Sequence, residues 1–105
     1  MSSASTQPDQ AVDQIRQALA AYQNAHPRSQ IEIKRQNNVS IRIRIIDPDF
    51  AARSLHQRED AVWEILNSLP GEVRSDITMV LLLTPEEQND SLASQDFDHP
   101  VPSRL

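Results

Sequence analysis

Residues 50–87 read FAARSLHQREDAVWEILNSLPGEVRSDITMVLLLTPEE, and this stretch decides the fold. Ser54 and Gln57 have the spacing of a capping box, which satisfies free N–H groups at the start of a helix. Apolar residues then recur at helical spacing, so we expect the helix to bury Leu55, Val62, Ile65, Leu66 and Leu69. Pro70-Gly71 ends this helix, and an apolar strand is predicted over residues 74–83.

The predicted third strand is apolar on both faces. Strict alternation places one set of side chains on a single face, namely Ile77, Met79, Leu81 and Leu83. Val80 and Leu82 then point to the opposite face, which must be either covered or exposed. Because exposed apolar surface invites association, we predict that Val80 and Leu82 take part in self-association or in docking a partner.

Upstream of this stretch, a helix is predicted over residues 8–25. Thr6 and Asp9 have the spacing of a capping box, and His26-Pro27 ends the helix because the residue before proline is pushed out of the α region. Apolar residues recur at helical spacing between these limits, namely Val12, Ile15, Leu19 and Tyr22.

Two alternating segments after this helix predict an antiparallel hairpin, with strands over residues 30–36 and 39–46. Asn37-Asn38 lies between them, and asparagine accepts the left-handed conformations that tight hairpins use. Asp47-Pro48-Asp49 then ends the second strand, because proline cannot donate to a sheet ladder.

The order of elements is therefore α-β-β-α-β, an α+β fold. A right-handed crossover through the second helix would set strands two and three parallel, giving a three-stranded mixed sheet with both helices on one face. We divide the chain into a flexible leader over residues 1–7, a single domain over 8–87 and a disordered acidic tail over 88–105.

Composition limits the classes of function. The chain has 105 residues, no cysteine and a net charge of −5. Most of that charge lies in residues 85–105, where five carboxylates face one arginine, for a net −4. The absence of cysteine excludes disulfides, thiolate metal sites and a catalytic thiol. Because the longest apolar run, Met79 to Leu83, is too short to span a bilayer, we expect a cytoplasmic protein with no membrane segment.

The stretch at residues 50–87 resembles part of the BolA-like family, whose topology is similar to the type II KH arrangement. Both ends of the stretch are similar to the family's sequence pattern. The C-terminal end of the stretch is Thr84-Pro85-Glu86-Glu87. The family's pattern at the start of the main helix falls on Phe50, Ala52, Arg53, Ser54, Arg58, Glu59 and Val62. The resemblance implies a BolA-like domain, and about 80 residues follow the order of elements of that family.

This chain departs from the family where the family keeps its histidines. The resemblance implies a partnership with monothiol glutaredoxins and an iron–sulfur cluster held by a histidine at the start of strand three. Here Glu59 and Asp76 occupy the two histidine positions, and Gln36-Asn37-Asn38 fills the hairpin loop. A carboxylate is a harder ligand than imidazole and a poor substitute at such a cluster. We therefore expect no cofactor, and the glutaredoxin-partnered role is the second alternative.

The leading interpretation is a non-enzymatic adaptor or regulatory domain that acts through protein contacts. The three histidines, His26, His56 and His99, are not spaced like the ligands of a metal ion. Their positions also do not indicate a catalytic base next to a nucleophilic side chain. We therefore predict no catalytic residue and no metal site. The predicted contact residues lie on strand three and at the start of the main helix, and they are Val80, Leu82, Phe50, Arg53 and Arg58.

The first alternative is KH-like nucleic-acid binding through a basic sheet face. Lys34, Arg42 and Arg44 alternate with the apolar residues of the hairpin and should share one face of the sheet. Glu32 lies on the same face, and no aromatic residue of the hairpin could stack on bases. The glycine-rich loop of KH domains is also missing, since Gly71 is the chain's single glycine.

Overall fold

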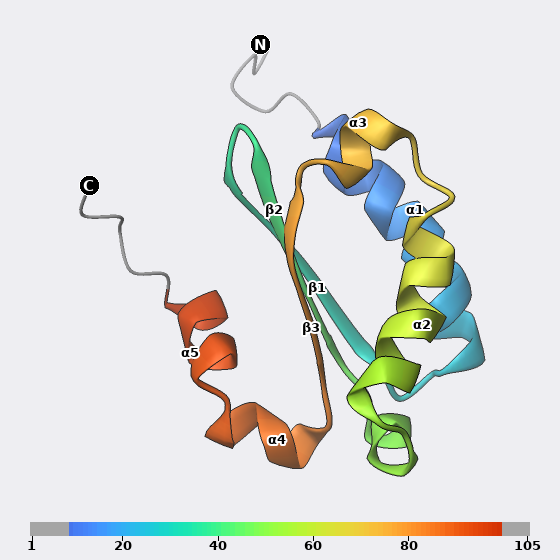
Figure 1. The fold of residues 1–105 in the computed structure, drawn as a ribbon, viewed down its shortest axis with the longest axis vertical. Coiled ribbons are helices and arrows are strands. Elements are labelled where there is room, and N and C mark those ends of the chain that lie inside the picture. Colours follow the sequence, from blue (N-terminus) through green and yellow to red (C-terminus); the bar gives the residue numbers. More distant parts are fainter. Residues whose placement is uncertain (1–8, 100–105) are drawn as a thin grey trace, which may run out of the picture.

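The computed structural model describes residues 9–99. It contains a three-stranded sheet with helices on both sides (Figure 1). The elements in chain order are α1 (Gln10–Ala25), β1 (Gln30–Asn37), β2 (Ser40–Ile46), the 3-10 helix η2 (Pro48–Ala52), α2 (Leu55–Leu66), α3 (Gly71–Arg74), β3 (Ile77–Leu83), α4 (Pro85–Asp90) and α5 (Leu92–Asp98). The predicted leader and residues 100–105 of the predicted tail lie outside the described residues.

The sheet has the predicted mixed topology. Its order is β1-β2-β3, with β1 antiparallel to β2 and β2 parallel to β3. The α+β class and the three-stranded mixed sheet are therefore confirmed. The hairpin turn differs in detail, because no residue among 9–99 has a positive φ angle. The register between β1 and β2 shifts between Arg35 and Asn37, so an irregularity takes the place of the expected left-handed asparagine turn.

Helices α1 and α2 begin at side-chain caps. The Asp9 carboxylate accepts a hydrogen bond from the N–H of Val12, so Asp9 itself caps α1. The expected partner Thr6 lies outside the described residues. Ser54 and Gln57 form the predicted capping box at the start of α2. Both helices pack on the same face of the sheet, as predicted (Figure 1).

The main core lies between these two helices and the sheet. It is built from apolar side chains of α1, β2, α2 and β3, closed at one end by Phe50 from η2. The fully or nearly fully buried members on the sheet and helices include Ile15, Leu19, Ile41, Ile43, Ile45, Val62, Leu66 and Leu82. Leu55 is an exception to the prediction for α2, because it is 60% exposed. It is the first residue of α2.

From Met79 onward, the faces of β3 are reversed with respect to the sequence prediction. Ile41 pairs with Ile77 but Arg42 pairs with Met79, so Thr78 is an extra residue in the strand. One extra residue switches every later side chain to the other face. Leu82 is consequently 2% exposed in the main core and Val80 packs against that core. Leu82 therefore belongs to the core and Val80 is half-buried, and a role of either residue in binding a partner stays a prediction.

The second face of the sheet is covered by the segment after β3. Residues 88–98 complete α4 and form α5, so the prediction of disorder is wrong for them. Figure 1 shows α5 on the side of the sheet opposite α1 and α2. Phe97 is fully buried there, and Ser94 beside it is 1% exposed. An aromatic side chain that buries its whole surface anchors a segment that its polar composition alone would leave unfolded.

No helix within residues 9–99 is both long enough and apolar enough to cross a membrane. The cytoplasmic location stays a prediction.

The reversed faces of β3 can be tested by comparing two apolar truncations. We expect Leu82→Ala to lower the free energy of unfolding by about 2–5 kcal/mol, because it leaves a cavity in the core. Val39→Ala, at a residue that is 68% exposed in the hairpin turn, should change it by less than about 0.5 kcal/mol. Urea denaturation measures both values. Equal small effects would contradict the assignment of Leu82 to the core.

Candidate functional site

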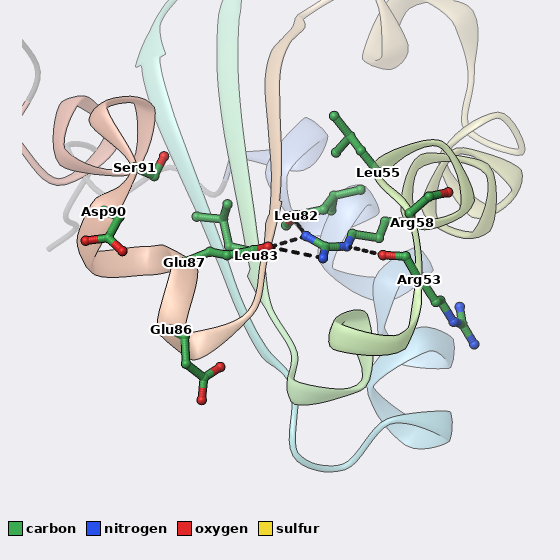
Figure 2. A pocket seen from close by; sticks show the side chains of 10 residues that line it. Arg53, Leu55, Arg58, Leu82, Leu83, Glu86, Glu87, Asp90 and Ser91 are labelled. Atoms are coloured by element: carbon green, nitrogen blue, oxygen red, sulfur yellow. Dashed lines mark hydrogen bonds and ion pairs between the residues drawn. The ribbon is translucent and has the colours of Figure 1, made fainter.

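A groove opens between the start of α2 and helix α4. It has a volume of about 660 Å³. Figure 2 shows Arg53 and Leu55 on the α2 side of this groove, with Glu86 and Asp90 on the α4 side. Leu82 and Leu83 of β3 also line it. The groove therefore combines an apolar lining with charged side chains of both signs at its edges.

Arg58 holds the two sides of the groove together. Its guanidinium donates to the carbonyl oxygens of Phe50 and Arg53, each at 3.2 Å, and to the carbonyl of Leu82 at 3.1 Å. It also forms an ion pair with Glu87 of α4, with Nη1 and Oε1 2.7 Å apart. The Arg58 guanidinium in turn lowers the pKa of the Glu87 carboxyl. One buried cation thus links η2, α2, β3 and α4.

The predicted contact residues are therefore divided between the core and the groove. Phe50 is fully buried, and Arg58 is only 8% exposed with its donors engaged inside the protein. Neither presents its side chain as a free surface. Arg53 is half-buried and lines the groove, so it is the member of the predicted set that a partner could reach.

The predicted basic face exists, but α5 covers the part around Arg42 and Arg44, while Lys34 stays exposed. The Arg44 side chain is 3% exposed, and it donates to Glu32 from Nε at 2.7 Å and to Asp98 from Nη2 at 2.8 Å. A third contact joins its Nη1 to the hydroxyl oxygen of Ser94, also at 2.7 Å. These carboxylates raise the pKa of the Arg44 guanidinium further, while Arg44 lowers that of Asp98.

The other two cations of this face also contact α5. Arg42 pairs with Asp96, with Nη1 and Oδ2 2.9 Å apart. Lys34 donates to the carbonyl oxygen of Phe97 at 3.1 Å, and its Nζ lies 4.5 Å from the centre of the Phe97 ring. In this conformation the acidic and aromatic side chains of α5 occupy the surface that a phosphate backbone would need.

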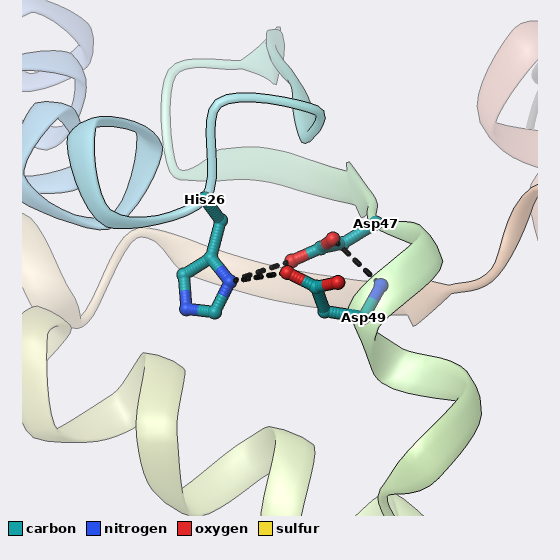
Figure 3. Close-up of side chains that lie close together, drawn as sticks. All are labelled: His26, Asp47 and Asp49. Atoms are coloured by element: carbon teal, nitrogen blue, oxygen red, sulfur yellow. Dashed lines mark hydrogen bonds and ion pairs between the residues drawn. The ribbon is translucent and has the colours of Figure 1, made fainter.

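A third cluster joins the end of α1 to the start of η2 (Figure 3). His26 follows α1, and its Nδ1 lies 3.0 Å from Oδ2 of Asp49 and 3.4 Å from Oδ2 of Asp47. The imidazole stacks on Tyr22, with 4.3 Å between ring centroids. The Tyr22 hydroxyl donates to Asp47 at 2.6 Å. Burial and the Asp47 carboxylate together raise the pKa of that hydroxyl.

Sequence reasoning missed this His-Asp-Asp cluster. It compared the spacing of histidines with one another, whereas the cluster combines one histidine with two carboxylates 21 and 23 residues later. The available signal was Asp47-Pro48-Asp49, two acids directly after a predicted half-buried strand. His56 instead pairs with Asp60 on the surface of α2 at 3.3 Å, and both side chains are largely exposed.

Comparisons of this chain with protein families, curated proteins and solved structures found no match. The residues described above are therefore the basis for any functional conclusion.

The attachment of α5 should depend on pH through Asp98. Arg44 holds the folded-state pKa of Asp98 below its ordinary value of 3.8. The ionised Asp98 carboxylate therefore makes its full contribution to the free energy of unfolding at pH values above 3.8. It is lost as the pH falls through the lower, folded-state pKa. We expect Asp98→Asn to be less stable than wild type at neutral pH and the difference to narrow below about pH 4.

Urea midpoints measured across this pH range, with Phe97 ring resonances as a local probe of α5, test the expectation. Asp90→Asn removes an exposed carboxylate of α4 outside the Arg44 cluster and controls for the change of net charge. A difference between wild type and Asp98→Asn that stayed constant with pH would contradict the role given to the Arg44 pair.

Proposed function

We propose that this chain is a non-enzymatic, divergent BolA-like domain that acts as an adaptor by binding a protein segment in the groove between α2 and α4. The α-β-β-α-β order with a parallel β2–β3 pair is consistent with the BolA-like resemblance. The observation that carries the binding proposal is Leu55, which is 60% exposed although it lines the groove. A large apolar side chain at the edge of an apolar groove is typical of a contact surface.

The groove favours a partner of defined chemistry. The lining by Leu55, Leu82 and Leu83 suits one apolar anchor side chain, as in helices or peptides that bind in grooves. On the α4 side Glu86 and Asp90 are exposed and form no ion pair among residues 9–99, whereas Glu87, also exposed, is paired with Arg58. We therefore propose a peptide segment with an apolar anchor followed by lysine or arginine, since its cations would meet these two carboxylates.

The shape of this groove should persist without the partner. Its α2 side begins at a capping box, Ser54 with Gln57, and its α4 side at a second one, Thr84 with Glu87. Arg58 bonds directly to Glu87 and to the backbone that precedes α2, so the two sides are fixed relative to one another. Binding to such a preorganised surface avoids part of the entropic cost of association.

The two alternatives from the sequence have less support. For nucleic-acid binding, the cations Lys34, Arg42 and Arg44 are engaged by α5. For an iron–sulfur role with a glutaredoxin, Asp76 offers only hard oxygen ligands and lies 3.8 Å from Arg35 in an ion pair.

Selection from a phage-displayed peptide library on the immobilised chain tests the proposal. We expect enriched peptides to share an apolar anchor next to lysine or arginine. Leu55→Asp should weaken their binding about tenfold or more, because it places a charge where the anchor packs. Replacing Glu86 and Asp90 together by lysine should weaken the same peptides through charge repulsion.

Val39→Asp is the matched control, because Val39 is also a highly exposed apolar residue but lies in the hairpin turn, outside the groove. Binding to this variant should equal that of wild type. Peptides that bind Leu55→Asp as well as wild type, or a failure to enrich any common motif, would rule out the groove as the binding site.

A further inference from the structure

The carboxylate of Asp47 lies inside the protein without an arginine or lysine partner among residues 9–99. Its side chain is fully buried, and the one basic group within ion-pair distance in this part of the chain is the imidazole of His26. A buried carboxylate is costly unless a positive charge compensates it. The Asp49 carboxylate also approaches Nδ1 of His26, through Oδ2. The other oxygen of Asp49, Oδ1, is paired with Arg28.

Two kinds of cation could meet this requirement. One is a proton on His26, which would make the imidazole a donor toward both acids. The other is a metal ion bound by the neutral imidazole and the two carboxylates. In Figure 3 the carboxylates of Asp47 and Asp49 converge on Nδ1 of His26, and one ligand atom from each of the three residues lies within 4.8 Å of the other two.

The distances from His26 to the two carboxylates are compatible with a shared metal ion. Metal–ligand bonds of about 2.0–2.2 Å separated by angles of about 90–110° place neighbouring donor atoms roughly 3.0–3.5 Å apart. His26 Nδ1 lies 3.0 Å from Asp49, which is also a hydrogen-bond distance, and 3.4 Å from Asp47. One nitrogen and two carboxylate oxygens form a ligand set that zinc and neighbouring divalent transition metals accept.

The surrounding bonds orient these ligands. Asp47 accepts the Tyr22 hydroxyl on Oδ2 at 2.6 Å and the N–H of Asp49 on Oδ1 at 2.9 Å. Arg28 donates to Oδ1 of Asp49, the oxygen that does not approach His26. Stacking on Tyr22 fixes the plane of the His26 ring. Such outer contacts hold metal ligands in position in known sites.

We propose that His26, Asp47 and Asp49 form a binding site for one divalent transition-metal ion. The side chain of Asp49 is 39% exposed and that of His26 is 18% exposed, so an ion can reach the site from solvent. The three ligands leave coordination positions for water. A bound ion would tie the end of α1 to the start of η2, two segments more than 20 residues apart in the chain.

Isothermal titration of the untagged full chain with Zn²⁺ tests this site. We expect one ion to bind per chain and to raise the melting temperature, since a ligand that binds only the folded state stabilises it. His26→Gln and Asp49→Asn should each weaken binding about tenfold or more. The matched controls are His56→Gln and Asp60→Asn, because this exposed pair offers the same residue types without a third ligand, and they should bind like wild type.

Imidazole ¹⁵N spectra of the wild-type chain give a second measurement that does not depend on how the variants fold. Zn²⁺ should shift Nδ1 of His26 and leave His56 and His99 unchanged. The proposal is overturned if the wild-type chain shows no saturable Zn²⁺ binding. It is also overturned if binding survives in folded His26→Gln, or if Zn²⁺ shifts His56 or His99 in place of His26.

Discussion

Strand β2 is largely buried on both faces, and the side chains on its two faces need different kinds of neighbour. Ile41, Ile43 and Ile45 on one face need only apolar neighbours, which α1 and α2 supply. The other face carries Arg44, whose charge cannot be buried at 3% exposure without compensation. Glu32 on the adjacent strand supplies one carboxylate and Asp98 on α5 supplies the other.

The position of α5 follows from that requirement. The helix has seven residues, too few to be stable alone in water. It is held because Phe97 buries its ring against Lys34 and Arg44 while Asp96 and Asp98 meet the arginines of β2. The acidic charge of the C-terminal region thus belongs in part to the folded domain, where it neutralises a basic sheet face. This is the reason why a surface suited to phosphate in the sequence is engaged in the structure.

Arg58 is a second buried cation that joins distant segments, as Arg44 does, but it bonds to the backbone of β3. Because it is bonded to three carbonyl groups and to Glu87, it fixes where α2 begins and where α4 leaves the sheet. The groove between those helices is a consequence of this arrangement. Leu55 lines that groove as the first residue of α2, which explains why an apolar residue of an amphipathic helix stays exposed.

The candidate sites were harder to predict than the elements because they depend on single-residue register and on distant contacts. The extra residue at Thr78 is enough to exchange the faces of the rest of β3, and a single threonine at the start of an apolar strand does not by itself indicate a bulge. The joining of His26 to Asp47 and Asp49 similarly requires the path of the chain through β1 and β2. The predicted cations were correctly assigned to one face, but the partners of Arg42 and Arg44 on α5 lie more than 50 residues away in the chain.

The sequence by itself determined the α+β class, the order of the main helices and strands, and the capping box at Ser54, because apolar periodicity and capping are local properties of the chain. Only the tertiary structure decided that Leu82 belongs to the core, that residues 92–98 fold onto the sheet and that a histidine meets two aspartates. These features come from burial and charge compensation between distant segments. Such long-range pairing leaves no periodic signal in the sequence.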